Sequence, residues 1–224
     1  MINQPKLSVI IPVYNTEEYL DECIQSVLDG FLRDRQRLEI IVVSDCSEGD
    51  TEGVLEKYRG GVPASIVYVK HNSNKGLYQA RVTGFKIAKG EYITSIDSDD
   101  LFVNVDLNGY LKTMDDDDID ILRIKKLIGS DRFHIDKKHE SWTSSQTSFS
   151  LTTHDDIWNW FTSDMHWAMH GTFYRRSIIE RGLTCINTEL TFINSNEDLC
   201  FNSVFFYLAK TFRYEKTQGF YLYR

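Results

Sequence analysis

The first half of the chain alternates between short apolar runs and longer segments in which apolar residues recur at helical spacing. The apolar runs are rich in Val, Ile, Leu and Tyr, which predicts strands that are buried on both faces of a sheet. The predicted strands are residues 7–13, 38–43, 65–70, 91–96 and 119–124. Apolar positions three or four residues apart predict helices, and Thr16 is the expected N-cap of the first helix. The predicted helices are residues 16–30, 51–58 and 77–88.

This alternation of strands and helices predicts an α/β fold with a mainly parallel, Rossmann-like sheet flanked by helices. Such sheets bind ligands in the crevice beyond the carboxyl ends of their strands. Polar residues follow three of the predicted strands at that edge, namely the turn 12–15, Asp45 and the acidic segment 97–100. We therefore expect a pocket for a nucleotide or a sugar phosphate, in which the nucleotide is held together with a metal ion.

The acidic segment Asp97-Ser98-Asp99-Asp100 directly follows the fourth predicted strand. Carboxylates at the edge of a low-dielectric core repel each other, and a divalent cation relieves that repulsion. Mg²⁺ and Mn²⁺ prefer oxygen ligands of this kind. A solvated loop would also accommodate these acids, so it is their place in the strand and helix pattern that favours a metal site.

The periodicity fades after about residue 128, and the second half of the chain is predicted to be irregular. Aromatic residues crowd the stretch 158–173, where core packing explains most of them and one or two could offer a flat platform to a sugar ring. His166 and His170 have the spacing that places two imidazoles on one helical face, but no third ligand is evident, so we interpret them as packing residues. A last helix is expected to begin at Asn196.

Composition limits the classes of function that the chain can serve. Its 224 residues suit one α/β domain, and a net charge of −8 argues against a broad nucleic-acid surface. Four cysteines without C-x-x-C spacing are expected to be reduced thiols. No signal peptide precedes the first strand, and the apolar stretches are far shorter than the roughly 20 residues of a membrane-spanning helix. We expect a cytoplasmic protein, and peripheral attachment to the inner face of the membrane stays open.

Four segments in the first half, in this order, resemble the family-two inverting glycosyltransferases of the GT-A fold. They are Ser8–Asn15, Ile41–Ser47, Asn74–Gly76 and Gly90–Asp100. In the second half, Tyr174-Arg175-Arg176 and Glu197-Asp198 resemble the pattern in bacterial capsule, exopolysaccharide and lipopolysaccharide members. The resemblance implies one GT-A domain over 1–224, with a nucleotide-sugar-binding half (1–127) and an irregular acceptor-side half (128–224).

The implied reaction is inverting transfer of a sugar from a nucleotide-sugar donor, UDP-linked by expectation, to a glycan or glycolipid acceptor of a cell-surface polysaccharide. Such transfer is a single in-line displacement, so one carboxylate must accept the proton of the attacking hydroxyl. By resemblance that base is Asp198, with Glu197 beside it. A divalent ion, Mn²⁺ or Mg²⁺, would stabilise the charge that develops on the leaving diphosphate.

The resemblance also implies the residues of the donor and metal sites. Asp97 would face the ribose or a metal-bound water, Asp99 would coordinate the metal, and Asp100 is the alternative ligand. Asp45 would hydrogen-bond the uracil ring. The remaining residues expected around the donor are Pro12, Val13, Tyr14, Asn15, Asn74, Lys75 and Ser98. Of these, Asn74 and Lys75 also suit a turn and helix start, from which Lys75 could reach phosphate.

The chain departs from the family pattern at several places. Ser44 and Cys46 flank Asp45 where the family has an acid and a glycine, and His170–Phe173 replaces a tryptophan-x-lysine pattern, so we expect an unusual acceptor side. The chain also ends early for the family, which leaves a further C-terminal segment open. Arg81 is interpreted as a helix-surface or sheet-anchoring residue, with contact to the diphosphate as the alternative.

Two other functions remain to be weighed against transfer. A nucleotidyltransferase would resemble this chain in its α/β sheet and metal acids, but it needs a glycine-rich basic loop after the first strand, and residues 12–15 contain neither glycine nor lysine. A catalytically idle module that binds a nucleotide or a glycan would fit the altered residues around Asp45.

Overall fold

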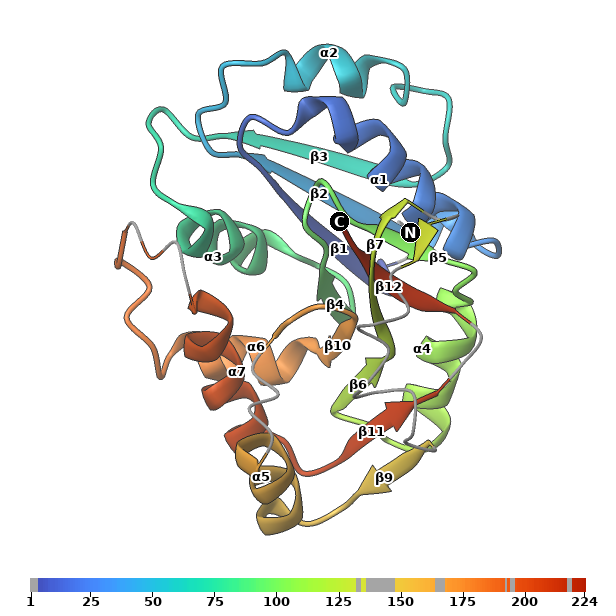
Figure 1. The fold of residues 1–224 in the computed structure, drawn as a ribbon, viewed down its shortest axis with the longest axis vertical. Coiled ribbons are helices and arrows are strands. Elements are labelled where there is room, and N and C mark those ends of the chain that lie inside the picture. The colour runs from blue at the N-terminus through green and yellow to red at the C-terminus, as the bar shows by residue number, and fades with distance from the viewer. Residues whose placement is uncertain are drawn as a thin grey trace.

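The computed structural model describes residues 4–131, 134–135, 148–163, 168–191, 193, 196–216 and 219–224. An eight-stranded sheet crosses the molecule in the order β3-β2-β1-β4-β10-β6-β11-β9 (Figure 1). In chain order its strands are β1 (Leu7–Val13), β2 (Leu38–Ser44), β3 (Ser65–Lys70), β4 (Tyr92–Ser95), β6 (Ile121–Ile124), β9 (Phe149–Leu151), β10 (Thr172–Arg175) and β11 (Phe212–Glu215). The helices are α1 (Glu17–Gly30), α2 (Thr51–Glu56), α3 (Leu77–Ile87), α4 (Leu107–Asp116), α5 (His154–Ser163), α6 (Arg176–Leu183) and α7 (Glu197–Leu208), with a 3₁₀ turn at Arg35–Arg37.

The sheet is mainly parallel, as the sequence predicts. Strand β1 lies between β2 and β4 and pairs with both in parallel, and β2 pairs in parallel with β3. The short strand β10 is antiparallel to β4 and to β6, and β9 is antiparallel to β11. These two reversed strands come from the half of the chain in which the sequence pattern is irregular.

A second sheet packs near one end of α1. Its order is β5-β12-β7-β8, and its strands are β5 (Leu101–Val103), β7 (Lys126–Asp131), β8 (His134–Ile135) and β12 (Phe220–Tyr223). Strand β12 pairs antiparallel with β5 and parallel with β7. This sheet brings the segment after the acidic cluster together with residues from the end of the described chain.

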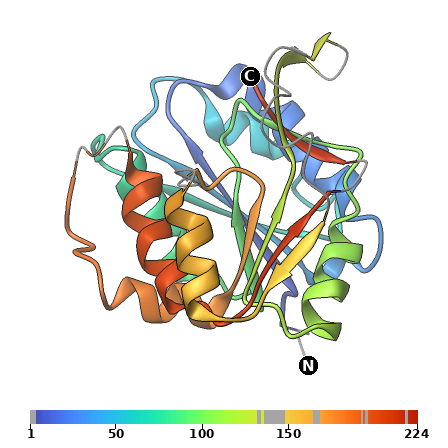
Figure 2. The same ribbon diagram turned by 60° about the horizontal axis from the view of Figure 1, so that its bottom comes forward.

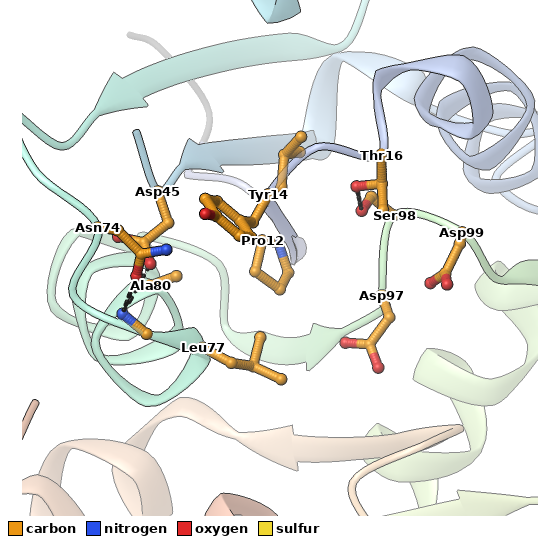
Figure 3. A pocket seen from close by; sticks show the side chains of 12 residues that line it. Pro12, Tyr14, Thr16, Asp45, Asn74, Leu77, Ala80, Asp97, Ser98 and Asp99 are labelled. Carbon is orange, nitrogen blue, oxygen red and sulfur yellow. Dashed lines mark hydrogen bonds between the residues drawn. The ribbon is translucent and has the colours of Figure 1, made fainter. Parts of the chain in front are cut away.

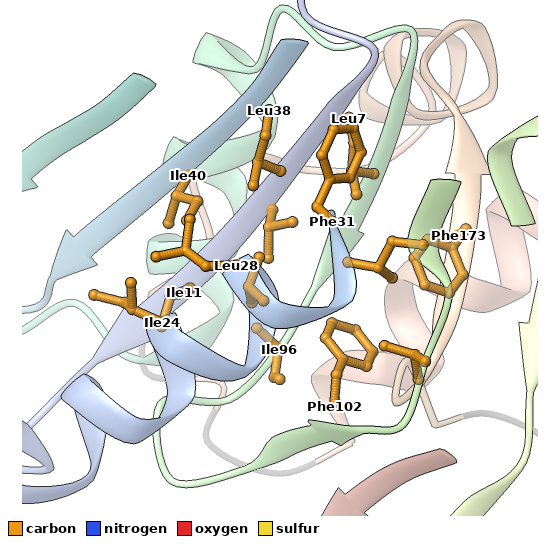
Figure 4. Close-up of a cluster of buried hydrophobic side chains, with 14 of the residues drawn as sticks. Leu7, Ile11, Ile24, Leu28, Phe31, Leu38, Ile40, Ile96, Phe102 and Phe173 are labelled. Atoms are coloured by element: carbon orange, nitrogen blue, oxygen red, sulfur yellow. The ribbon is translucent and has the colours of Figure 1, made fainter. Parts of the chain in front are cut away.

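Helices cover both faces of the large sheet, so its central strands bury alternate side chains in two cores. Leu7, Val9 and Ile11 of β1 pack with α1 and α4, whereas Ile10 packs on the opposite face, where α3, α6 and α7 lie. Figure 4 shows the first of these cores, with Ile24 and Leu28 of α1 against the sheet. Figure 2 shows α5 and α7 together on one side of the sheet and α4 on the other. Burial on both faces explains why these strands are continuous apolar runs.

Several predicted details differ from the structure. Thr16 precedes α1 as expected, but its side chain caps no helix N–H; its hydroxyl pairs instead with the Ser98 hydroxyl at 2.6 Å. The second predicted helix ends at Glu56 rather than at residue 58. Helix α5 ends at Ser163, so His170 is not on a helix, and His166 lies outside the described residues.

None of the helices that the structure describes is both long enough and apolar enough to cross a membrane.

Candidate active site

A cavity of about 290 Å³ opens at the carboxyl ends of β1, β2 and β4. Because parallel strands end at the same edge of a sheet, three segments distant in sequence meet there. Figure 3 shows Asp45 and Asn74 at one end of the cavity, Asp97 and Asp99 at the other, and Tyr14 between them. The lining residues are Pro12, Val13, Tyr14, Thr16, Asp45, Asn74, Gly76, Leu77, Ala80, Asp97, Ser98 and Asp99.

Two residues that the sequence analysis assigned to the donor are not among the lining residues. Asn15 adopts a left-handed backbone conformation (φ 56°), and its side-chain oxygen accepts a hydrogen bond from the Glu48 N–H at 2.9 Å. Asn15 therefore joins the loops that follow β1 and β2. The side chain of Lys75 is exposed, and its backbone N–H donates to Asp45. The other predicted donor residues do line the cavity.

Asp45 is held by donors from three directions. Its carboxylate accepts hydrogen bonds from the backbone N–H groups of Lys75 (2.9 Å) and Gly76 (2.7 Å), and its Oδ1 lies 2.6 Å from Nδ1 of His71. The other ring nitrogen of His71 lies 2.9 Å from the Thr83 hydroxyl. Gly76 has φ 89°, a conformation that favours glycine, so the approach of its N–H to Asp45 depends on this residue type. Asp45 is thus fixed in place before any ligand arrives.

The unusual Cys46 adopts a backbone conformation that favours glycine. Its φ is 62°, in the left-handed region that glycine adopts without strain and other residues rarely enter. The conformation that a glycine would favour is thus present with Cys46, and Asp45 lines the cavity.

A single buried arginine joins the acidic segment to the predicted base. Arg81 is only 2% exposed, which contradicts its interpretation as a helix-surface residue. Its Nη2 lies 2.7 Å from Asp97, and its Nη1 lies 2.6 Å from Glu197 and 2.5 Å from Asp198. The second oxygen of Asp198 accepts a hydrogen bond from the Met169 N–H at 3.0 Å. One guanidinium thus sets the positions of three carboxylates, those of Asp97, Glu197 and Asp198.

The charges in this cluster shift several pKa values. Burial raises the pKa of Asp97, but the positive charge of Arg81 and a hydrogen bond from His170 outweigh burial and hold that pKa below its ordinary value. Burial raises the pKa of Glu197 more than Arg81 lowers it, so Glu197 holds its proton more tightly than an exposed glutamate does. Burial and the charge of Asp97 raise the pKa of Asp100 to about 7.

Asp97, Asp100 and His170 form a candidate metal centre, since their ligand atoms all lie within 4.8 Å of one another. Both oxygens of Asp100 accept hydrogen bonds, from the Tyr221 hydroxyl at 2.6 Å and from the Arg224 N–H at 2.9 Å, which orients the carboxylate. The two carboxylates are oxygen ligands of the kind that Mn²⁺ and Mg²⁺ prefer, and the imidazole suits a transition ion such as Mn²⁺ better than Mg²⁺. Burial and the charge of Asp97 raise the pKa of Asp100, and a bound cation would offset both effects. The residues present therefore fit a divalent ion.

The sequence analysis did not assign His170 to this centre. Nε2 of His170 lies 3.5 Å from Asp97 Oδ2. Two signals in the sequence pointed to this position, the spacing from His166 and the departure from the tryptophan-x-lysine pattern, but His170 was interpreted as a packing residue. Asp99, the expected metal ligand, lines the cavity but does not belong to the group of three. Its pKa is raised by burial and by Asp97.

Residues 8–183 match the family model described as glycosyl transferase family 2. Because the match covers well over half of the chain, this protein belongs to that family, as its sequence motifs predicted.

Individual relatives and solved structures agree with this assignment. The uncharacterized glycosyltransferase EpsJ of Bacillus subtilis is 28% identical over 98% of this chain and 61% of its own length. The crystal structure of Staphylococcus aureus TarS 1-349 in complex with UDP has a TM-score of 0.77 at 23% identity, covering 97% of this chain and 60% of that one. The mannosyltransferase PcManGT of Pyrobaculum calidifontis, in complex with GDP-Man and Mn²⁺, has a TM-score of 0.64 at 18% identity, covering 90% and 52%. These likenesses confirm the predicted GT-A type of α/β fold.

The chain is shorter than the proteins that it resembles. It spans between 13% and 61% of the length of the first curated relatives that it matches.

Proposed function

We propose that this chain transfers a sugar, with inversion and with a divalent ion, from a UDP-linked donor to an acceptor of a bacterial cell-wall polysaccharide. The observation that carries the proposal is the arrangement around one cavity. At one end, Asp45 is a preformed hydrogen-bond acceptor for a nucleobase. At the other end lies the candidate metal centre, with the buried carboxylates of Glu197 and Asp198 beside it. Family membership supports the reaction class. A similar chain, 33% identical over 54% of this one, is the poly(ribitol-phosphate) beta-N-acetylglucosaminyltransferase TarS, which supports an acceptor of the teichoic-acid type.

The nucleoside of the donor is proposed to occupy the end of the cavity that contains Asp45. Tyr14 and Pro12 would cover the base and ribose, and Asn74 lies beside Asp45 (Figure 3). The protein already donates three hydrogen bonds to the Asp45 carboxylate. A uracil N–H would therefore bind a carboxylate oxygen of Asp45 that also accepts a hydrogen bond from the protein. A TarS structure in complex with UDP-GlcNAc supports testing that donor first.

At the other end, Asp97, Asp100 and His170 would hold Mn²⁺ or Mg²⁺, with Asp99 as a further ligand. When bound, the ion supplies positive charge that stabilises the leaving diphosphate. The PcManGT complex with Mn²⁺ supports a metal in this fold without fixing which ion this chain uses.

Asp198 is proposed as the general base. Its carboxylate is buried and held by the Met169 N–H and by Arg81, which also contacts Asp97 of the cavity. In the proposed reaction Asp198 accepts the proton of the acceptor hydroxyl as that oxygen attacks the anomeric carbon, and the bond to the diphosphate breaks on the opposite side. Glu197 contacts the same nitrogen of Arg81, and burial raises its pKa, so it is the second candidate.

The division into a donor half and an acceptor half is also part of the proposal. All lining residues of the cavity lie within 1–127, whereas Glu197 and Asp198 reach the site from the second half. We expect the reaction to occur in the cytoplasm, because the nucleotide-sugar donor is found there. The acceptor would be presented at the inner face of the membrane.

The test is release of UDP from UDP-sugars, beginning with UDP-GlcNAc, with Mn²⁺ or EDTA and with a ribitol-phosphate acceptor. Metal-dependent release that the acceptor accelerates supports transfer. We expect Asp198→Asn to lower turnover by about 10²–10⁴-fold while UDP affinity stays unchanged. UDP binding by the wild type without turnover on any donor would instead identify an idle binding module, and near-normal turnover of Asp198→Asn would remove Asp198 from the role of base.

A further inference from the structure

The second sheet presents a polar face to the candidate metal centre. Strand β12 pairs in parallel with β7, and Tyr221 lies opposite Lys126 in the register. Side chains alternate along a strand, so Phe220 and Leu222 point into a small apolar cluster on one face. Tyr221, Tyr223 and Lys126 share the opposite face.

Contacts on this face continue outward from the metal centre. His170 lies with Nε2 3.5 Å from Asp97 Oδ2, and its Nδ1 lies 3.4 Å from the Lys126 ammonium. The same ammonium lies 4.2 Å from the centre of the Tyr223 ring. The contacts therefore run from Asp97 through His170 and Lys126 to Tyr223. Asp97 lies at the end of the cavity away from Asp45 (Figure 3).

Lys126 is a half-buried cation on which Asp97, Asp100 and Asp198 act electrostatically, but it forms no direct ion pair with any of these three acids. Within the part of the chain that the structure describes, no carboxylate lies within ion-pair distance of its ammonium, although Arg81 and Arg224 nearby are each paired with acids. An aromatic face and an imidazole nitrogen compensate a desolvated ammonium only in part. A ligand with negative charge would complete this arrangement, and lysine is a common partner of phosphate.

We propose that Lys126, with the ring of Tyr223 beside it, binds a phosphate group of the substrates next to the reacting centre. The proposal rests on the proposed function. A phosphate can reach this position from two sources: the phosphate of the donor that is distal to the nucleoside, or a phosphate in the backbone of the acceptor. Tyr223 is 39% exposed, so its ring is accessible to the sugar or polyol attached to that phosphate.

The experiment compares the wild type with Lys126→Met, in which a flexible side chain of similar length lacks the charge. Lys126→Arg tests rescue by a second cation. The matched control is Lys112→Met, which removes an exposed charge on α4 that is paired with Asp116. Calorimetry gives the affinities for UDP and UMP in Mg²⁺, and ³¹P line broadening reports the binding of glycerol 3-phosphate to protein loaded with Mg²⁺ and UDP.

A charged hydrogen bond to phosphate corresponds to about a tenfold to hundredfold change in affinity. If Lys126→Met weakens the binding of UDP by that factor and the binding of UMP much less, Lys126 binds the donor phosphate. If UDP affinity is unchanged and binding of glycerol 3-phosphate is lost, Lys126 binds an acceptor phosphate. In either case Lys126→Arg should retain most of the affinity, and Lys112→Met should behave as the wild type.

Other results would overturn the proposal. If Lys126→Met keeps both affinities, or if the wild type binds neither probe more tightly than this variant does, Lys126 is not a phosphate ligand. A lowered melting temperature with unchanged phosphate binding would show that Lys126 only balances the nearby acids. Failure of the proposed function is separate, because it would appear as absence of sugar turnover while the effect of Lys126 on phosphate binding persisted.

Discussion

Replacing Arg81 by methionine should both destabilise the protein and make its stability depend on metal. Arg81 is 2% exposed and is the shared partner of Asp97, Glu197 and Asp198. Removing one member of a buried ion pair costs about 3–5 kcal/mol, because the remaining charge is left without compensation. Since about 1 kcal/mol shifts the melting temperature of a chain of this size by about 2–4 °C, Arg81→Met should melt about 6–20 °C below the wild type in EDTA.

Saturating Mn²⁺ should reduce the difference in melting temperature between the wild type and Arg81→Met. The ion would sit against Asp97, one of the three carboxylates that Arg81 neutralises, and a ligand at one hundred times its Kd adds about 2.7 kcal/mol to the stability of the folded state. Mn²⁺ should therefore raise the melting temperature of the variant more than that of the wild type. Arg81→Lys should lie between the two, since one ammonium keeps the charge but cannot contact carboxylates from two nitrogens.

The control is Arg59→Met. Arg59 also pairs with two acids, Glu52 and Glu56, but its side chain is 59% exposed, so the same substitution should change the stability by at most about 0.5 kcal/mol. The assay is thermal unfolding followed by circular dichroism, in EDTA and in Mn²⁺. If Arg81→Met and Arg59→Met have the same melting temperature, or if Mn²⁺ raises the melting temperatures of all variants equally, Arg81 does not hold the three carboxylates in the way described.

Two further predictions concern the two ends of the cavity. Because the pKa of Asp100 is raised to about 7, the metal-free folded protein binds a proton that the unfolded chain has lost, and its stability should fall as pH rises from about 4 to 7. Melting in EDTA should show a smaller fall for Asp100→Asn, and equal slopes would contradict this origin. At the other end, His71→Phe removes the 2.6 Å contact to Asp45 and should lower stability by about 1–3 kcal/mol and weaken UDP binding several-fold in calorimetry. Thr83→Val, which alters only the outer side of His71, should have a smaller effect on UDP, and unchanged UDP affinity in His71→Phe would contradict a positioning role.

The parallel half of the sheet was predictable because its signal is local. β1 begins and ends where its apolar run does, since a strand covered by helices on both faces leaves no polar positions to interrupt the run. β3 also has the predicted bounds, but it is an edge strand with exposed ends and half-buried middle residues, so the expected burial on both faces is wrong for it. The same order of elements placed the carboxyl ends of β1, β2 and β4 at one edge. The predicted meeting of three polar segments in one cavity follows from that topology rather than from any contact visible in the sequence.

Strand β10 and the second sheet were not predicted, for a physical reason. β5 has only three residues, which is too short for a period to stand out from chance. β10 has four, of which only Phe173 and Tyr174 are apolar, and it follows a stretch without periodicity. β10 enters the middle of the sheet between β4 and β6, so its position depends on pairing with strands from the first half. Thr16 illustrates the same limit. Local rules assign its side chain to helix capping, but its hydroxyl forms a hydrogen bond with the hydroxyl of the distant Ser98 instead.

The chemistry of the site depends on contacts between the two halves of the chain, which is why sequence reasoning placed Arg81 on a helix surface. Arg81 and Glu197 are 116 residues apart, and no local pattern distinguishes an arginine that faces solvent from one that faces distant acids. Once they are placed together, the cavity and the catalytic carboxylates cannot be independent: the guanidinium that orients Asp198 also lowers the pKa of Asp97. Asp97 contacts Nη2 of this guanidinium and Asp198 contacts Nη1, so we expect a ligand that moves Asp97 toward a metal to shift the contact between Arg81 and Asp198. Donor binding in the first half would thereby adjust the base that the second half supplies.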